Sequence, residues 1–452
     1  MVQIKKIKVV NLFDYYCYEI KMNSHSNISI IHAPNGYGKT TVFNLVKHYL
    51  DFDVYKIHLI PFEKFTIELT NKMSLVVEKN DNGEMHFVIS ESEKKVDCNI
   101  DYRFFCQVYS RSKNVKEYTQ RIHNLLRRPH PEIVDFEKIH NQCQENLAVI
   151  DKLKELYKNL SLNIINSNRL FINEPSHDPY GNKYVNNKMY FLPDEYIEED
   201  LSGNNRKEVI ISDADNILTK MQNARQKYSI ISESIDRNFP NRLVECVEDK
   251  NYLPYNDSEI KDKLKSLEEK RLELQNAGLL QPGKNTLTPA GDIDDTMRKF
   301  YTLYINDSFR KLKLYDDIKS KLELFIDIIN TKTAFSNKKM VIDTQKGVFF
   351  EPIQSKTGKK HDIPLEKLSS GEKHDFIMFY ELIFNSKKNS IVLIDEPEIS
   401  LHVAWQMQFI NILERICVLN NIQVIVATHS PDIATGHEDL LISLGLEEDL
   451  ND

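Results

Sequence analysis

The feature that most constrains the fold of this 452-residue chain is a set of four short motifs divided between its two ends. The first is Ala33–Thr41 (APNGYGKTT). The other three follow one another late in the sequence, at Leu368–Lys373 (LSSGEK), Ile391–Glu398 (IVLIDEPE) and Ala427–Pro431 (ATHSP). Because all four suit one phosphate ligand, we expect both ends of the chain to meet in one domain, with the residues between them inserted into it.

The first motif has the composition of a phosphate-binding loop. It follows an apolar strand-like run, Ile28–Ile31, and leads into Thr40–Leu50, which has apolar residues at helical spacing. Backbone N–H groups at such a helix N-terminus bind an anion. The usual pattern starts with Gly where this chain has Ala33, a change that costs little if φ stays negative. We therefore predict that ATP is bound by Asn35, Gly36, Gly38, Lys39, Thr40 and Thr41, with Thr40 also a ligand of Mg²⁺.

Two carboxylates follow the apolar run Ile391–Ile394, which is typical of a buried strand. Asp395 is predicted to hold Mg²⁺ through the water shell of the ion. Glu396 is predicted to orient or deprotonate the water that attacks the γ-phosphate. Adjacent acids at a strand end can also mark a simple turn, but a turn does not explain the neighbouring motifs.

Two further strand ends supply candidate catalytic side chains. His429 follows Gln423–Ala427 and is predicted to contact the γ-phosphate. Gln107 follows Phe104–Cys106 and is the candidate glutamine that helps to bind Mg²⁺ and water. With Lys39 on the terminal phosphates, they join Glu396 in the predicted catalytic set.

Leu368–Glu372 resembles the signature sequence of ABC-type ATPases, with Ser370 and Glu372 where Gly and Gln are more familiar. Hydroxyl and N–H groups that open a helix can bind phosphate oxygens. The resemblance implies that this turn completes the site of the opposite subunit, so that hydrolysis requires a head-to-head dimer. The implied nucleotide contacts are Ser369, Ser370, Gly371 and Glu372.

Taken together, the motifs resemble the ABC-type ATPases of the structural-maintenance and overcoming-lysogenization-defect group, most closely over residues 338–431. Asn168–Leu170 is similar to a less specific segment of that group, and Pro397–His402 occupies the place of the loop that crosses the dimer interface. The resemblance implies an α/β fold: an ABC-type ATPase head, with a mixed sheet and flanking helices, split by a helical, partly coiled-coil insertion.

We predict the N-terminal part of the head at 1–130, the insertion at 131–332 and the C-terminal part of the head at 333–452. Within the insertion, Glu- and Lys-rich stretches have apolar residues every three or four positions. These stretches are Ile139–Leu160, Ile260–Leu272 and Phe309–Phe325. An antiparallel coiled coil and ordinary helical packing both fit this pattern.

The chain is most similar to stand-alone anti-phage defence ATPases, first the PARIS ATPase subunit AriA and next the Septu ATPase. Many relatives continue into a TOPRIM nuclease domain, whereas only a short acidic stretch follows His437 here, so we expect no nuclease activity in this chain. The resemblance implies a sensor that assembles into a higher homo-oligomer, answers a viral trigger protein and controls a separate effector nuclease.

Two other functions remain open: a DNA-repair or recombination ATPase, and a nucleotide-gated scaffold with little turnover. Basic residues gather between Arg103 and Arg128, with Glu117 the one acid among them. That segment fits DNA, an acidic protein or simple solvation equally well.

Composition and net charge indicate the cellular compartment of the protein and the ligands that it does not bind. No apolar run reaches the ~18–20 residues of a membrane helix, so we expect no membrane association. The six cysteines are scattered, which favours reduced thiols in a cytoplasm. The net charge of −8 argues against indiscriminate coating of nucleic acid. The acidic groups Asp213–Asp215 and Asp292–Asp295 are expected to be solvated and not to bind metal.

Overall fold

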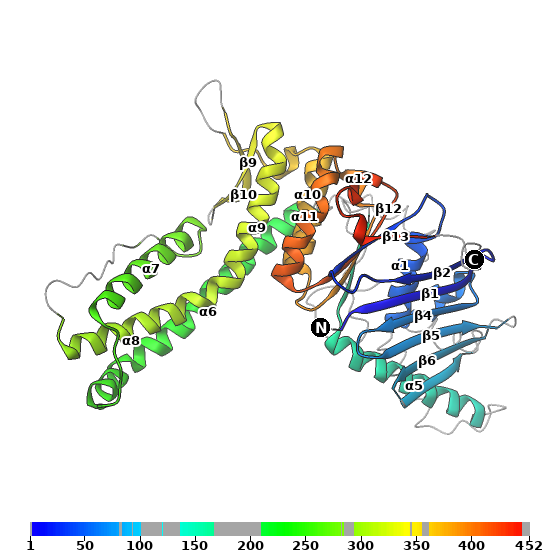
Figure 1. Ribbon diagram of the computed structural model, residues 1–452, viewed down its shortest axis with the longest axis horizontal. Coiled ribbons are helices and arrows are strands. Elements are labelled where there is room, and N and C mark those ends of the chain that lie inside the picture. Colours follow the sequence, from blue (N-terminus) through cyan, green and yellow to red (C-terminus); the bar gives the residue numbers. More distant parts are fainter. Residues whose placement is uncertain are drawn as a thin grey trace. The chain divides into compact units, whose positions relative to one another are not determined.

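The computed structural model describes residues 2–80, 84–92, 94–100, 120, 136–166, 209–281, 283, 293–343, 346–354 and 361–444. The chain divides into two compact units. Unit 1 comprises Met1–Arg206 and Asn385–Asp452, and unit 2 comprises Lys207–Phe384. Figure 1 shows the two ends of the sequence, blue and red, within unit 1. The expected insertion is therefore present, although it starts and ends later in the sequence than predicted.

A five-stranded sheet in unit 1 brings the motifs together. Its order is β13-β3-β12-β11-β8, and all the pairs are parallel. Every residue of β11 and β12 is buried, as expected for a parallel sheet covered on both faces. In the register, Asp395 lies opposite Ala427, and Thr428 lies opposite His32, so three strands end side by side. The strands are β3 (Ile28–His32), β8 (Leu162–Ile165), β11 (Ile391–Asp395), β12 (Gln423–Thr428) and β13 (Leu441–Ser443).

A second, antiparallel sheet of six strands has the order β2-β1-β4-β5-β6-β7. Buried and accessible residues alternate along its strands, which places one face on the core. The other face has cross-strand ion pairs such as Lys6–Glu68 and Lys64–Glu78. The strands are β1 (Ile4–Leu12), β2 (Tyr16–Lys21), β4 (Lys64–Leu69), β5 (Met73–Lys79), β6 (Met85–Glu91) and β7 (Lys94–Ile100).

Helix α1 (Lys39–Leu50) shares one hydrophobic core with inward side chains of both sheets. Its buried Val42, Leu45, Val46 and Tyr49 are the residues whose spacing predicts a helix. The Tyr49 hydroxyl also lies within 3.0 Å of the Val88 carbonyl on β6, to which it donates. The phosphate loop is thereby anchored to the core through the helix that follows it.

Helix α5 (Phe136–Asn159) corrects one expectation. Its periodic pattern predicts a helix, and a helix forms, but it lies in unit 1 and not in the insertion. Leu147, Ile150 and Leu153 pack into the same core as the antiparallel sheet, and Lys152 pairs with Glu91 of β6 at 2.8 Å. Amphipathic periodicity identifies a buried face without identifying the core that receives it.

Unit 1 contains five further helices within its described residues. They are α2 (Val54–Leu59), η6 (Pro397–Ser400), α11 (Val403–Asn420), α12 (Pro431–Ala434) and η7 (Glu438–Leu440). Cys17, Cys98, Cys246 and Cys417 are free thiols. Within the described part of the chain, no helix is both long and apolar enough to cross a membrane.

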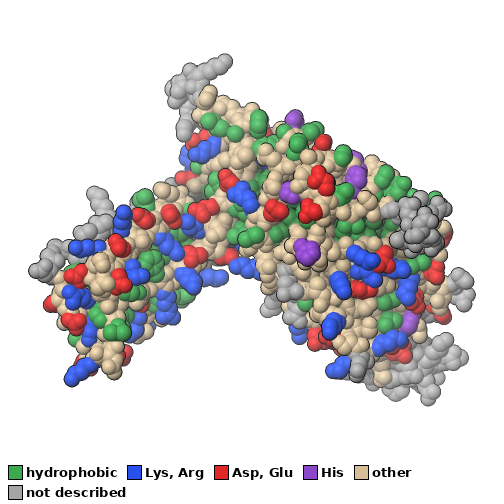
Figure 2. All heavy atoms as spheres, in the orientation of Figure 1, with side chains coloured by type: hydrophobic (Ala, Val, Ile, Leu, Met, Phe, Trp, Pro, Cys, Tyr) green, Lys and Arg blue, Asp and Glu red, His purple; other side chains and the backbone are tan. Residues whose placement is uncertain are grey.

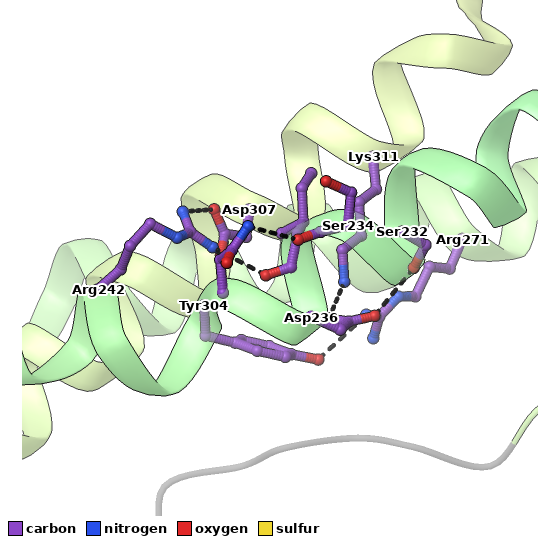
Figure 3. A network of polar contacts seen from close by, with 10 residues as sticks. Ser232, Ser234, Asp236, Arg242, Arg271, Tyr304, Asp307 and Lys311 are labelled. Atoms are coloured by element: carbon purple, nitrogen blue, oxygen red, sulfur yellow. Dashed lines mark hydrogen bonds and ion pairs between the residues drawn. The ribbon is translucent and has the colours of Figure 1, made fainter.

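Unit 2 is built on antiparallel helices. Tyr228 of α6 contacts Tyr315 of η2, whereas Arg242, further along α6, contacts the earlier residue Asp307 of α8. Helix α6 is therefore antiparallel to α8 and η2. Figure 3 shows the polar part of this contact, where Arg242 donates to the Asp307 carboxylate and Lys311 donates to the Asp236 carboxylate. The helices are α6 (Val209–Glu248), α7 (Asp257–Asn276), α8 (Asp295–Leu312), η2 (Lys313–Tyr315) and α9 (Asp316–Thr333).

The acidic cluster around Asp295 has a structural role. The Asp294 carboxylate accepts the Met297 N–H at 2.7 Å and caps α8. Asn256 and Glu259 form a capping box at the start of α7. Figure 2 shows acidic and basic side chains mixed over α6, α7 and α8, as on a solvated surface. No cluster of three or more potential metal ligands occurs among the described residues.

Unit 2 also contains a hairpin and the signature helix. The hairpin pairs β9 (Lys338–Asp343) with β10 (Gly347–Pro352), and η3 (Ala334–Ser336) precedes it. After η4 (Leu365–Lys367) comes α10 (Ser370–Tyr380), which packs on α6 and α9 and leads into a π-helical turn, η5 (Glu381–Asn385). This packing is why the signature motif groups with the helical unit, although the predicted boundary at 332/333 assigns it to the head.

Candidate nucleotide-binding site

The phosphate loop has the backbone that its glycines permit. Gly36 and Gly38 have φ values of +89° and +75°, in the left-handed region. A Cβ on Gly38 would stand 2.9 Å from Cδ2 of buried Leu12, so this glycine also allows close approach to β1. Ala33 is not among the residues with positive φ and is only 2% exposed, its methyl group lying in the core. The alanine at the first position is therefore accommodated without backbone strain.

Lys39 lies across the mouth of the loop. Its Nζ donates to the carbonyl oxygens of Ala33, at 2.7 Å, and Pro34, at 2.9 Å. Burial lowers the pKa of Lys39, while the nearby carboxylates of Glu396 and Asp395 act in the opposite direction. A buried ammonium that donates to backbone carbonyl oxygens suits a phosphate anion at this position.

Thr40 and Asp395 join the two distant parts of the sequence. The Thr40 hydroxyl donates to Oδ2 of Asp395 at 2.7 Å. Oδ1 of Asp395 is buried and has no hydrogen-bond partner in the described part of the chain. Burial raises the pKa of Asp395, against the effects of Thr40 and Lys39. A hydroxyl beside an unsatisfied carboxylate oxygen is a donor set that fits Mg²⁺.

Glu396 occupies an unusual backbone position. Its φ of 47° and ψ of 56° lie in the left-handed region, which is uncommon for a residue other than glycine. Its N–H donates to the Ala427 carbonyl at 2.9 Å, so the turn after β11 is tied to β12. Such conformations occur at sites where the surrounding structure enforces them. The turn presents a half-buried carboxylate beside Asp395, as the predicted general base requires.

Glu398 is a site residue to which the sequence reasoning gives no role. Its Oε1 lies 2.8 Å from both the backbone nitrogen and Nδ1 of His429. The Glu398 side chain is 4% exposed and that of His429 is 40% exposed, so a buried acid holds an accessible imidazole. Because Nδ1 is engaged, Nε2 is the nitrogen left for a ligand. The only signal in the sequence is that Glu398 stands two residues after Glu396.

His32 is a second residue that the sequence reasoning misses. It ends β3, directly before the phosphate loop. Burial lowers the pKa of His32, the positive charges of Lys39 and His429 lower it further, and Glu398 raises it. The histidine therefore places an imidazole of lowered pKa at the same edge of the sheet. Its location at the end of an apolar strand is the only hint in the sequence.

The signature turn is a capped helix start in unit 2. The Glu372 N–H donates to Oγ of Ser369 at 3.3 Å, and Oε2 of Glu372 accepts the Ser369 N–H at 2.8 Å. Oγ of Ser369 acts here as an acceptor, which leaves its proton for another partner. The Glu372 carboxylate also accepts from Lys338 at 2.8 Å and from Ser336 at 2.6 Å. Burial raises the pKa of Glu372, and these hydrogen bonds outweigh burial and lower it overall.

The predicted residues thus fall into two groups. The phosphate loop, Asp395, Glu396 and His429 lie at the carboxyl edge of one sheet in unit 1, while Ser369–Glu372 lie in unit 2. Glu372 faces its own unit, and nucleotide contacts from this turn stay a prediction. Gln107, the basic segment Arg103–Arg128 and Asn168–Leu170 lie outside the described residues, apart from Gln120.

Comparison with known proteins bears on the second half of the chain. Residues 253–434 match the family model described as "AAA domain, putative AbiEii toxin, Type IV TA system". The match includes the signature, IVLIDEPE and ATHSP motifs, and the phosphate loop precedes it. Over these residues the chain is similar to an AAA domain.

Two solved structures are similar over nearly the whole chain. One is an Smc head bound to the C-winged helix domain of ScpA, with 10% identity, a TM-score of 0.32 and coverage of 97% of this chain and 93% of that one. The other is an Smc head domain with a coiled coil and joint from Pyrococcus yayanosii, with 14% identity, a TM-score of 0.31 and coverage of 98% and 95%. At these TM-scores the functional argument rests on the geometry of the site and on the matched family model.

Proposed function

We propose that this protein binds ATP with Mg²⁺ and hydrolyses it, and that a second copy of the chain completes the site. The observation that carries the proposal is the Thr40–Asp395 hydrogen bond of 2.7 Å. It places the end of the phosphate loop, which follows β3, against the acid that ends β11, with β12 between the two strands. A loop, an acid and a histidine at the carboxyl ends of adjacent parallel strands form the usual position of a ligand site in such sheets.

Each residue has a role that its geometry allows. The N–H groups that open α1 and the Lys39 ammonium receive the β- and γ-phosphates. Glu396 accepts a proton from the attacking water, and His429, oriented by Glu398, donates from Nε2 to the γ-phosphate. When bound, Mg²⁺ would supply positive charge that offsets the negative charge of the phosphates. Thr40 and Asp395 are the residues that would hold it.

Completion by a second copy follows from the signature turn. The N–H groups at the start of α10 and the Ser369 hydroxyl are hydrogen-bond donors of the kind that bind anions. The resemblance of LSSGEK to the ABC signature favours a partner nucleotide as the anion, in a head-to-head dimer within a higher homo-oligomer. Exposed Ile399 and Val403, in and beside the loop predicted to cross the interface, supply apolar surface for such a contact.

The matched family model favours a defence or toxin–antitoxin-like setting, because its description names a putative AbiEii toxin. We propose a cytoplasmic ATPase subunit that senses a viral trigger protein and controls a separate effector nuclease, most closely a TOPRIM nuclease as in PARIS systems. The motif resemblance and the helical insertion support this assignment. DNA contact belongs to the same proposal.

The test uses a hydrolysis-blocked variant. In Glu396→Gln the carboxylate base is lost while the binding groups remain, so ATP with Mg²⁺ should accumulate a dimer that sedimentation velocity detects. Lys39→Ala under the same conditions should stay in its nucleotide-free state. A Glu396→Gln protein that neither binds ATP nor changes its association state would contradict the proposal. In cells, either substitution should abolish protection from phage, and full protection by either one would refute the regulatory role.

A further inference from the structure

Two lysines hold the signature helix from one side. Lys338, at the start of β9, lies 2.8 and 3.0 Å from the two carboxylate oxygens of Glu372. Lys332, at the end of α9, lies 3.2 Å from Oδ1 of Asp375. Glu372 and Asp375 are three residues apart and therefore share one face of α10. The α9–β9 segment thus pairs with the first two turns of the signature helix.

The first of these pairs reaches the signature serine directly. Glu372 accepts the Ser369 N–H and gives its own N–H to the Ser369 hydroxyl, so its carboxylate is the middle of a chain from Lys338 to Ser369. Ser336 is the third residue that donates a hydrogen bond to the same carboxylate. Any shift of Lys338 therefore changes the position of the helix cap.

The charge of Glu372 explains why the hydrogen bonds from Lys338 to Ser369 matter for phosphate binding. A carboxylate in the turn that receives a phosphate would repel the phosphate at short range. The more familiar glutamine at this position brings no such charge. In this protein Lys338 neutralises the Glu372 carboxylate and Ser336 donates a hydrogen bond to it, while the capping box of Ser369 and Glu372 is kept. The lysine is thus the compensation that an acidic signature turn requires.

We propose that Lys338 is a positioning residue for ATP hydrolysis. It neutralises Glu372 and fixes the Ser369 hydroxyl and the first N–H groups of α10 in the orientation that meets the nucleotide of the second copy. This inference rests on the proposed function. Lys338 itself contacts no nucleotide, so its removal acts through Glu372 and affects the composite site, while the phosphate loop keeps its affinity.

The test is a set of kinetic comparisons on the full chain. Lys338→Met should lower kcat about ten-fold, less than the ~100-fold that a misplacement of about 1 Å can cause, with KM for ATP changed by less than about two-fold. Lys338→Arg keeps the charge and should recover most of the lost rate. Lys339→Met is the matched control, because Lys339 is the exposed neighbour on the same strand, and it should leave kcat unchanged.

The second comparison separates positioning from folding. In a Glu372→Gln background there is no carboxylate to neutralise, and a Gln can still cap the helix. There, Lys338→Met should change kcat by less than about two-fold. An equal loss of kcat in both backgrounds, or an unchanged kcat in Lys338→Met alone, would overturn the inference. Failure of the proposed function looks different: the unmodified protein would show no ATP turnover, or Ser369→Arg would leave turnover intact.

Discussion

Gly38 offers a quantitative test of how β1 constrains the phosphate loop. In Gly38→Ala the alanine must adopt a left-handed φ of +75°, and its Cβ lies 2.9 Å from Cδ2 of Leu12. The conformation costs about 1–2 kcal/mol. The crowding costs about 1–3 kcal/mol, against a gain of about 0.4–1 kcal/mol from a stiffer unfolded chain. The net loss of stability should be about 1–5 kcal/mol, centred near 3 kcal/mol.

Gly36→Ala is the matched control. Its φ is +89°, but a Cβ there has nothing within 4 Å, so only the backbone cost applies and the net loss should stay near 1 kcal/mol. The difference is the crowding cost, centred near 2 kcal/mol, which corresponds to a Tm about 4–8 °C lower for Gly38→Ala in thermal unfolding without nucleotide. Leu12→Val, which removes the crowding methyl, should show favourable coupling with Gly38→Ala. Equal Tm values for the two alanine variants would refute the role assigned to Leu12.

Three further predictions concern other parts of the chain. Glu398→Gln should lower kcat about ten-fold or more with little change in KM, because the imidazole loses its buried carboxylate; steady-state kinetics would show a change in KM alone if the carboxylate served only to bind ATP. Asp307→Asn should destabilise unit 2 by about 2–4 kcal/mol, because it leaves Arg242 without its charged partner, and limited proteolysis of α6 and α8 should then be faster; an unchanged rate would contradict the structural weight given to this pair. Asp213 corrects another expectation, because it is buried on α6 and not solvated. Burial raises the pKa of Asp213 to about 8, with Glu381 adding to the shift, so the folded state retains a proton that the unfolded state releases. The free energy of unfolding of unit 2 should therefore fall as pH rises from about 4 to about 8. Urea titrations of Asp213→Asn should show a flatter pH dependence. An unchanged pH dependence in this variant would mean that Asp213 is ionised throughout.

The local elements of the site follow from the sequence because they depend on local physics. The apolar run before the phosphate loop, the glycines within it and the helical spacing after it predict strand, turn and helix in that order, and β3 and α1 confirm them. The mixed α/β fold with a helical insertion is likewise confirmed. Even the tolerance of Ala33 depends on one dihedral angle, whose sign could be stated in advance.

Long-range partners were not predictable in the same way. The contact between Glu398 and His429 spans 31 residues, and nothing in the spacing of the two motifs sets the distance between them. Glu372 looks like a nucleotide ligand from its motif alone, because its partner Lys338 is 34 residues upstream on a hairpin. Helix α5 shows the same limit, since an amphipathic pattern does not name its core.

The central claim is that the phosphate loop of one copy and the signature turn of another form a single site. Mixing two inactive variants, Lys39→Ala and Ser369→Arg, tests it most directly. At equal amounts about half the dimers are mixed, and one of the two sites in each mixed dimer is intact, so about a quarter of the ATPase rate should return. The control mixes Lys39→Ala with a chain that has both substitutions and should recover nothing. If the first mixture also stays inactive while each variant still folds and associates, the composite site is wrong.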